Sequence, residues 1–149
     1  MLDRFETFVS GISRCHRSIQ KIKNAEMTEF GLRGTHVMCL FYLSRHSEGL
    51  TAAQLSALTF EDKAAVSRTL RELRSLDYIT ESAPETGRKY RAVIRLTDSG
   101  NKIAEKVSVL INRWVDSGGS GLTETEREIF YRALDKIADN LTSKSQKGL

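Results

Sequence analysis

The sequence predicts a mainly α-helical protein of the α+β class, with one β-hairpin set among its helices. Amphipathic helical spacing occupies both ends of the chain, and only one proline, Pro84, occurs in 149 residues. Proline removes a backbone donor and clashes with the preceding helical turn, so helical chains hold few of them. Two short β-branched or aromatic runs, at 78–80 and 92–96, flank this proline and predict the hairpin.

Two helices are expected before residue 45. In the first, seven apolar residues recur at steps of three and four among charged ones, which is the spacing of an amphipathic helix. The second follows Gly34, because residues 37–43 are apolar on every side, as in a helix buried within a core. The apolar stripe of the first helix comprises Leu2, Phe5, Phe8, Val9, Ile12, Ile19 and Ile22.

A helix, a turn and a second helix are expected next. Thr51 stands three residues before Gln54, a capping-box spacing that begins a short third helix. Asp62 is the expected N-cap of a fourth helix, which ends near Asp77. The inward stripe of this fourth helix comprises Val66, Leu70, Leu73 and Leu76.

Two further helices are expected after the hairpin. Thr97 caps a fifth helix, which ends at the glycine-rich residues 117–121. Thr123 and Glu126 have capping-box spacing at the start of a sixth, and the polar end "TSKSQKGL" is expected to fray. The long terminal helices carry apolar stripes without an obvious cover, which indicates pairing with another chain.

The excess positive charge of the chain lies in its centre. Residues 63–95 hold eight basic and four acidic residues. Their excess charge of +4 equals the net charge of the whole chain. A neutral frame with one basic segment favours contact between that segment and an anionic polymer. A basic helix face is also the solvated surface of many proteins, so the helix alone does not decide the matter.

The fourth helix has the side chains that a DNA-reading helix needs on its outward face. Small Ala64 and Ser67 let the backbone approach base edges, and Arg68 can bind guanine O6 and N7. Lys63, Thr69 and Arg71 are expected to hold phosphates. The hairpin tip adds three basic residues beside this helix, suited to the minor groove or the DNA backbone; they are Arg88, Lys89 and Arg91.

The segment "LTAAQLSALTFEDKAAVSRTLRELRSLDYI", followed by a basic hairpin and "LTDSG", resembles the MarR family of winged helix-turn-helix transcription regulators over essentially the full chain. The resemblance implies a homodimer whose first and last helices interleave. It also implies that each subunit offers a recognition helix and a wing to half of a pseudo-palindromic double-stranded DNA operator. The implied boundaries are one domain, 1–149, with a dimerisation region at 1–45 and 98–144, a DNA-binding subdomain at 50–97 and a tail at 145–149.

Within this resemblance, "KAAVSRTL" matches the recognition helix of the family, and Leu96, Thr97 and Gly100 match its exit from the wing. The chain departs from the family at the Asp-x-Arg of the wing, where Arg88 and Tyr90 stand instead. The residue that enters the minor groove is therefore open among Arg88, Lys89 and Arg91.

The function expected from the resemblance is a repressor released by a small aromatic effector. Candidate pocket residues are Ile12, His16, His36, Met38, Phe41 and Trp114. One alternative is a thiol-based redox sensor at Cys15, whose basic neighbours could lower the pKa of the thiol. Another is a winged helix that binds DNA non-specifically or contacts proteins.

Other classes of function have little support in the sequence. A Gly-rich phosphate loop, a clustered carboxylate pair and a nucleophile set are all missing, so no enzyme and no cofactor are expected. His36 and Cys39 could join Cys15, His16 or His46 at a metal, but so sparse a set predicts none. Both thiols are expected to be reduced and buried. Without a signal-like N-terminus or a long apolar run, a cytoplasmic protein with no membrane partner is expected.

Overall fold

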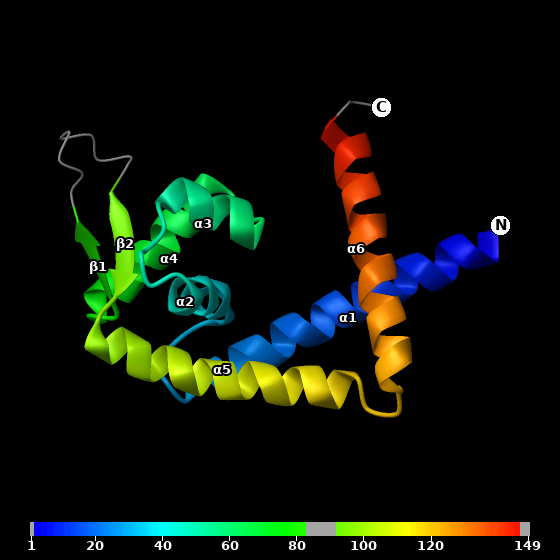
Figure 1. Ribbon diagram of the computed structural model, residues 1–149, viewed down its shortest axis with the longest axis horizontal. Helices are drawn as coiled ribbons and strands as arrows, with labels where there is room; N and C mark the ends of the chain where they lie inside the picture. The colour runs from blue at the N-terminus through cyan, green and yellow to red at the C-terminus, as the bar shows by residue number, and fades with distance from the viewer. Residues whose placement is uncertain (1, 83–91, 147–149) are drawn as a thin grey trace. The chain divides into compact units, whose positions relative to one another are not determined.

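The computed structural model describes residues 2–82 and 92–146, and its elements follow the predicted order (Figure 1). The mainly helical class with one hairpin is thus confirmed. The chain divides into two compact units, Met1–Leu110 and Ile111–Leu149. The elements are α1 (Leu2–Thr28), α2 (Gly34–Arg45), α3 (Ala52–Thr59), α4 (Lys63–Ser75), β1 (Ile79–Ser82), β2 (Val93–Leu96), α5 (Asp98–Gly118) and α6 (Glu124–Gln146).

The helices begin where the predicted caps stand. At α3 the Gln54 N–H donates to Thr51 Oγ1 at 3.2 Å, and the Thr51 N–H donates to Gln54 Oε1 at 2.8 Å. At α4 the Ala65 N–H donates to Asp62 Oδ1 at 2.7 Å. These bonds satisfy amides that have no partner within their own helix. Equivalent caps occur at α5, from Thr97 to Gly100, and at α6, from Thr123 to Glu126.

The core of the first unit lies among α2, α3, α4 and the two strands. The sequence predicted α2 as a buried helix, and six of its twelve residues are buried. The inward stripe of α4 packs toward the same core, except that Leu76 is 40 % exposed. The fully buried side chains of these elements are Val37, Leu40, Leu55, Val66, Leu73 and Ile94.

The two strands form an antiparallel pair, with Ile79 opposite Leu96 and Ser82 opposite Val93. The backbone of Leu50 adds a short bridge to the other edge of β2. Its N–H donates to the Ile94 carbonyl at 3.0 Å, and its carbonyl accepts from the Ile94 N–H at 2.9 Å. This bridge ties the segment before α3 to the hairpin, so the helix-turn-helix and the strands form one framework.

The start of α5 approaches the backbone of Tyr78 so closely that only glycine fits. A Cβ on Gly100 would lie 1.9 Å from the Tyr78 carbonyl oxygen, which also accepts the Thr97 N–H at 3.1 Å. The Thr97 hydroxyl donates to the Asp77 carbonyl at 2.6 Å. Thr97 and Gly100 therefore fasten α5 to the end of α4.

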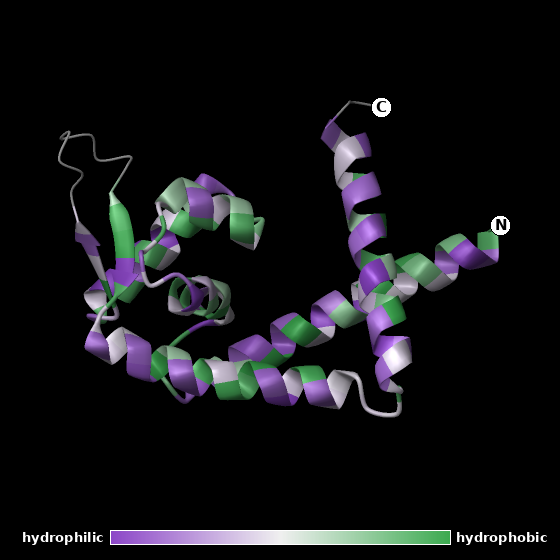
Figure 2. Ribbon diagram, in the orientation of Figure 1, coloured by the Kyte–Doolittle hydropathy of each residue, from purple (hydrophilic) through white to green (hydrophobic). Residues whose placement is uncertain are grey.

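The long helices at the two ends of the chain expose much of their apolar surface, which appears as green bands in Figure 2. In α1 only Met27 is buried, and Leu2 is 83 % exposed. In α6 no residue is buried, and Phe130 and Leu141 are half exposed. Among the described residues, no helix is both long enough and apolar enough to cross a bilayer.

The prediction of a frayed C-terminal end was wrong for residues 142–146, which continue α6. The segment from Thr142 to Gln146 contains no glycine or proline, so nothing in it breaks the helix. Residues 147–149 lie outside the described part.

Candidate nucleic-acid interface

Helix α4 has one buried and one exposed face. Val66, Leu70 and Leu73 are buried against the core. On the opposite side the sequence placed a row of small and basic residues, and this orientation is confirmed. The exposed residues of this outward row are Lys63, Ala64, Ser67, Arg68 and Arg71.

Thr69 does not belong to the outward row, although the sequence led us to expect that it holds a phosphate. Its side chain is 7 % exposed, because position 69 follows Val66 by three residues and precedes Leu73 by four, which places all three on one side of a helix. The Thr69 side chain is therefore turned away from the surface on which a phosphate would bind.

The basic residues that follow the outward row in the chain divide into two groups. The predicted wing residues Arg88, Lys89 and Arg91 lie outside the described residues. Among those described, Arg74 forms an ion pair with Glu81 of β1, and Arg95 Nη1 donates to Ser82 Oγ at 3.1 Å. Arg74 and Arg95 thus brace the strands of the hairpin. From the sequence, both were considered only as part of the positive charge of the segment.

A polar cluster joins the start of α2 to the middle of α4. The Arg33 N–H donates to His36 Nδ1 at 2.8 Å, so the neutral imidazole carries its proton on Nε2. That Nε2–H donates to Glu72 Oε2 at 2.8 Å, while the other oxygen of Glu72 pairs with the Arg33 guanidinium. Burial and the neighbouring Arg33 charge lower the pKa of His36, which favours the neutral ring.

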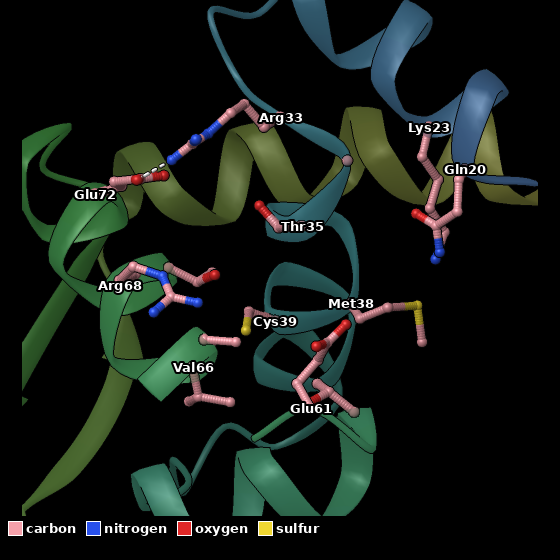
Figure 3. Close-up of a pocket in the computed structure, with 14 residues that line it drawn as sticks. Gln20, Lys23, Arg33, Thr35, Met38, Cys39, Glu61, Val66, Arg68 and Glu72 are labelled. Carbon is pink, nitrogen blue, oxygen red and sulfur yellow. Dashed lines mark hydrogen bonds and ion pairs between the residues drawn. The ribbon is translucent and has the colours of Figure 1, made fainter. Parts of the chain in front are cut away.

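The same cluster borders a cavity of about 130 Å³ enclosed by α1, α2 and α4 (Figure 3). Lys23 lines it from α1, and burial lowers the pKa of this ammonium while the Glu61 carboxylate opposes the shift. Met38 lines it from α2, and Thr69 from α4. The cavity thus lies along one flank of the helix that carries the outward row.

Of the six residues predicted to line a ligand pocket, only Met38 lines this cavity. His36 is buried but is engaged with Glu72, and Phe41 stacks beneath the Arg45 guanidinium at 5.4 Å. The remaining three are elsewhere: Ile12 and His16 are exposed on α1, and Trp114 belongs to the second unit. The periodicity of these residues did not indicate which helices enclose a space.

The two cysteines have different surroundings. Cys39 is 3 % exposed, and burial with the nearby Glu61 charge raises the pKa of its thiol to about 11, which makes the thiol inert at neutral pH. Cys15 is exposed on α1, so the expectation that both thiols are buried was wrong for it. Within residues 2–82 and 92–146, no three His, Cys, Asp or Glu side chains are grouped to hold a metal ion.

Comparisons with known proteins agree with this fold. The model of the MarR family matches residues 30–89, which run from just after α1 into the segment after β1. A comparison with curated proteins gave no match. Solved structures, in contrast, match nearly the whole chain.

Three of these structures illustrate the likeness. The S. aureus MepR–DNA complex has a TM-score of 0.81 at 23% identity, covering 91% of this chain and 97% of that one. A putative MarR family transcriptional regulator from Listeria monocytogenes, complexed with 26mer DNA, has a TM-score of 0.80 at 21% identity and covers 94% of both chains. A structure of MarR has a TM-score of 0.76 at 23% identity, covering 93% of this chain and 92% of that one.

At these identities the structural likeness establishes the fold, and the family model adds a match in sequence over the helix-turn-helix. The capped α3 and α4 lie within residues 30–89, whereas β2 and the Gly100 exit lie beyond them and belong to the structural likeness alone. The chain therefore has the fold of these MarR structures over nearly its whole length and matches the MarR family model in sequence over residues 30–89.

Proposed function

We propose that this protein is a sequence-specific, double-stranded DNA-binding transcription regulator. In this proposal α4 enters the major groove, which is wide enough for a helix. Two of the similar structures, MepR and the Listeria regulator, are complexes with DNA, which supports the same function for this chain.

The observation that carries the proposal is the outward row of α4. A helix that reads DNA needs donors for phosphates and base edges on a face that the rest of the fold leaves free. The outward row meets this need because the opposite face of α4 is buried in the core. Within the row, Ala64 and Ser67 keep the backbone accessible, and Arg68 supplies the guanidinium suited to guanine.

The test is selection of bound duplexes from fragmented genomic DNA by the purified full-length protein, followed by competition with random DNA. A specific regulator keeps a preference of at least about 10³ for its selected duplex at physiological salt. We expect Arg68→Ala to lose about 1–3 kcal/mol of binding free energy and to relax specificity at one base per half-site.

Arg74→Ala is the matched control for Arg68→Ala, because Arg74 lies on the same helix and is engaged with Glu81. Equal losses for the two variants would remove the special role of Arg68. Equal affinity of the unaltered protein for selected and random duplexes would instead favour the alternative of non-specific binding.

The regulator is proposed to act as a homodimer on a pseudo-palindromic operator. The exposed apolar stripes of α1 and α6 support this assembly, since soluble proteins seldom leave such long apolar surfaces uncovered. Paired recognition helices then bind two half-sites about one DNA turn apart.

Release by a small aromatic effector is the proposed mode of control. The cavity beside α4 supports it, because a ligand there would contact the flank of the reading helix and shift its position. In the repressing state, the bound protein would block access to the promoter. The measurement is a screen of small aromatic compounds for those that displace the selected duplex from the protein.

A further inference from the structure

Helix α4 carries a single carboxylate, that of Glu72, among basic side chains. Glu72 is the only acidic residue among the thirteen of α4. A negative charge near DNA opposes binding, and removing it should strengthen the attraction to phosphates. The contacts of Glu72 indicate a role that outweighs this cost.

Both carboxylate oxygens of Glu72 are engaged by the segment at the start of α2. Oε2 accepts the Nε2–H of His36 at 2.8 Å, and Oε1 pairs with the guanidinium of Arg33. The His36 side chain is only 3 % exposed and that of Glu72 is 35 % exposed, so this bond is partly buried, while Arg33 lies at the surface. Hydrogen bonds that involve a charged group are stronger and more directional than neutral ones.

His36 itself is held in place, which makes it a rigid anchor. Its Nδ1 accepts the Arg33 N–H at 2.8 Å, in the role that Glu or Gln fills in a capping box. The next amide, that of Gly34, donates to Asn24 Oδ1 of α1 at 2.9 Å. The start of α2 is thus fixed to α1, and Glu72 extends this attachment to α4.

The cavity explains why such an attachment matters at this place. Five residues of α4 line it. Ala65, Arg68, Thr69 and Glu72 lie along one flank of the helix, and Val66 marks the edge of its buried face. Of the five, only Glu72 has a side-chain hydrogen bond or ion pair to another element within the described residues, and Figure 3 shows it directed to Arg33.

We propose that Glu72, held by Arg33 and His36, is the positioning residue that sets the rotation of α4 about its axis and so the aim of the outward row at the bases. The inference rests on the proposed DNA-binding function. Without the Glu72 contacts, α4 can turn toward the cavity, because Leu70 and Leu73, which pack the helix against the core, do not line the cavity. Arg68, which shares the cavity flank one turn earlier, is the base-reading side chain most affected.

The proposal predicts an effect opposite in sign to that of simple electrostatics. Glu72→Gln keeps the shape of the side chain but removes a negative charge, so charge alone makes DNA binding equal or tighter. Loss of position makes binding to the selected duplex weaker. Glu72→Asp keeps the charge and shortens the side chain, so it tests position with no change in net charge.

The experiment measures affinity of the full-length protein for the duplex selected by the unaltered protein and for a random duplex of equal length. We expect both variants to bind the selected duplex about tenfold more weakly, roughly the effect of one mismatched base pair, and the random duplex no more weakly. Glu105→Gln on α5, an exposed residue, is the control for charge and should bind both duplexes as well as or better than the unaltered protein.

The outcomes separate the inference from the proposed function. If Glu72→Gln binds the selected duplex equally or more tightly, and Glu72→Asp binds it with unchanged affinity, the inference is overturned. The proposed DNA-binding function is not affected by that result. A parallel loss on both duplexes also overturns it, because a general loss of binding is not a loss of aim. Failure of the unaltered protein to prefer any duplex overturns the proposed function itself. Thermal melts of each variant confirm that the binding data come from folded protein.

Discussion

Helices α4 and α6 are both amphipathic, yet they bury their apolar residues to opposite extents. In α4 the stripe of Val66, Leu70 and Leu73 is buried by the core of its own unit. In α6, which is ten residues longer, no residue is buried, and Phe130 remains half exposed. The same pattern of apolar residues thus has two different environments within one chain.

The difference teaches that periodicity identifies a face but not what covers it. For α4 the cover comes from α2, α3 and the strands, so the free energy of its burial belongs to folding of the single chain. For α6 the described chain leaves the apolar face open, so in the proposed homodimer the burial of that face belongs to association with a second copy. Substitutions in the two helices should therefore respond differently to protein concentration.

The largest expected effect is the loss of stability from Leu73→Ala in α4. Leu73 is fully buried, and truncation leaves a cavity in the core that costs about 2–5 kcal/mol of the free energy of unfolding. Urea denaturation at two protein concentrations is the measurement, and the loss should be the same at both. Leu141→Ala in α6 is the matched control, with a loss that depends on concentration because the residue is 55 % exposed in the single chain. If both variants lost a similar free energy of unfolding at the two concentrations, the apolar face of α6 would not be buried by association.

The next effect concerns association, through Phe130→Asp in α6. A charge placed in a desolvated apolar interface is costly, so the dissociation constant of the dimer should rise at least about 100-fold. Sedimentation velocity at micromolar concentration measures the shift from dimer to monomer. Ser143→Asp adds the same charge on the opposite side of α6 and should leave the dimer intact. A dimer that persists in Phe130→Asp would mean that this face of α6 is not the interface.

Local features of the fold were predictable because they depend on residues close in sequence. A capping box needs only Thr51 and Gln54, three residues apart, and the structure forms it as predicted. The outward row of α4 was predictable for the same reason, since helical spacing alone separates it from Val66 and Leu70. For the wing tip at 88–91, the prediction stands as made, because those residues lie outside the described ones.

The tertiary contacts were not predictable in the same way. Glu72 meets His36 across 36 positions of sequence, a contact set by the packing of α4 against α2, which no local period encodes. Thr69 was misplaced because the buried face of α4 is wider than its three apolar residues suggest. The burial of Cys15 was predicted wrongly because it depends on which element packs against α1. The periodicity of α1 does not identify that element.

The smallest predicted effect is a gain of stability at the end of α4, from Asp77→Gly. Asp77 has a φ of 57°, in the left-handed region that glycine adopts without steric cost. Two bonds close the helix around it: the Asp77 N–H donates to the Arg74 carbonyl and the Tyr78 N–H to the Leu73 carbonyl, both at 3.0 Å. This is the Schellman arrangement, in which glycine is the usual residue.

Relief of the left-handed strain exceeds the larger unfolded-state entropy of glycine, so Asp77→Gly should gain about 0.5–1 kcal/mol. Asp77→Ala removes the same charge but keeps a Cβ, so it should gain nothing. Thermal melts at one protein concentration compare the three proteins. Equal stability of the glycine and alanine variants would show that backbone strain at Asp77 does not limit α4. A gain confined to glycine would show that the end of α4, like its buried face, is determined within the single chain.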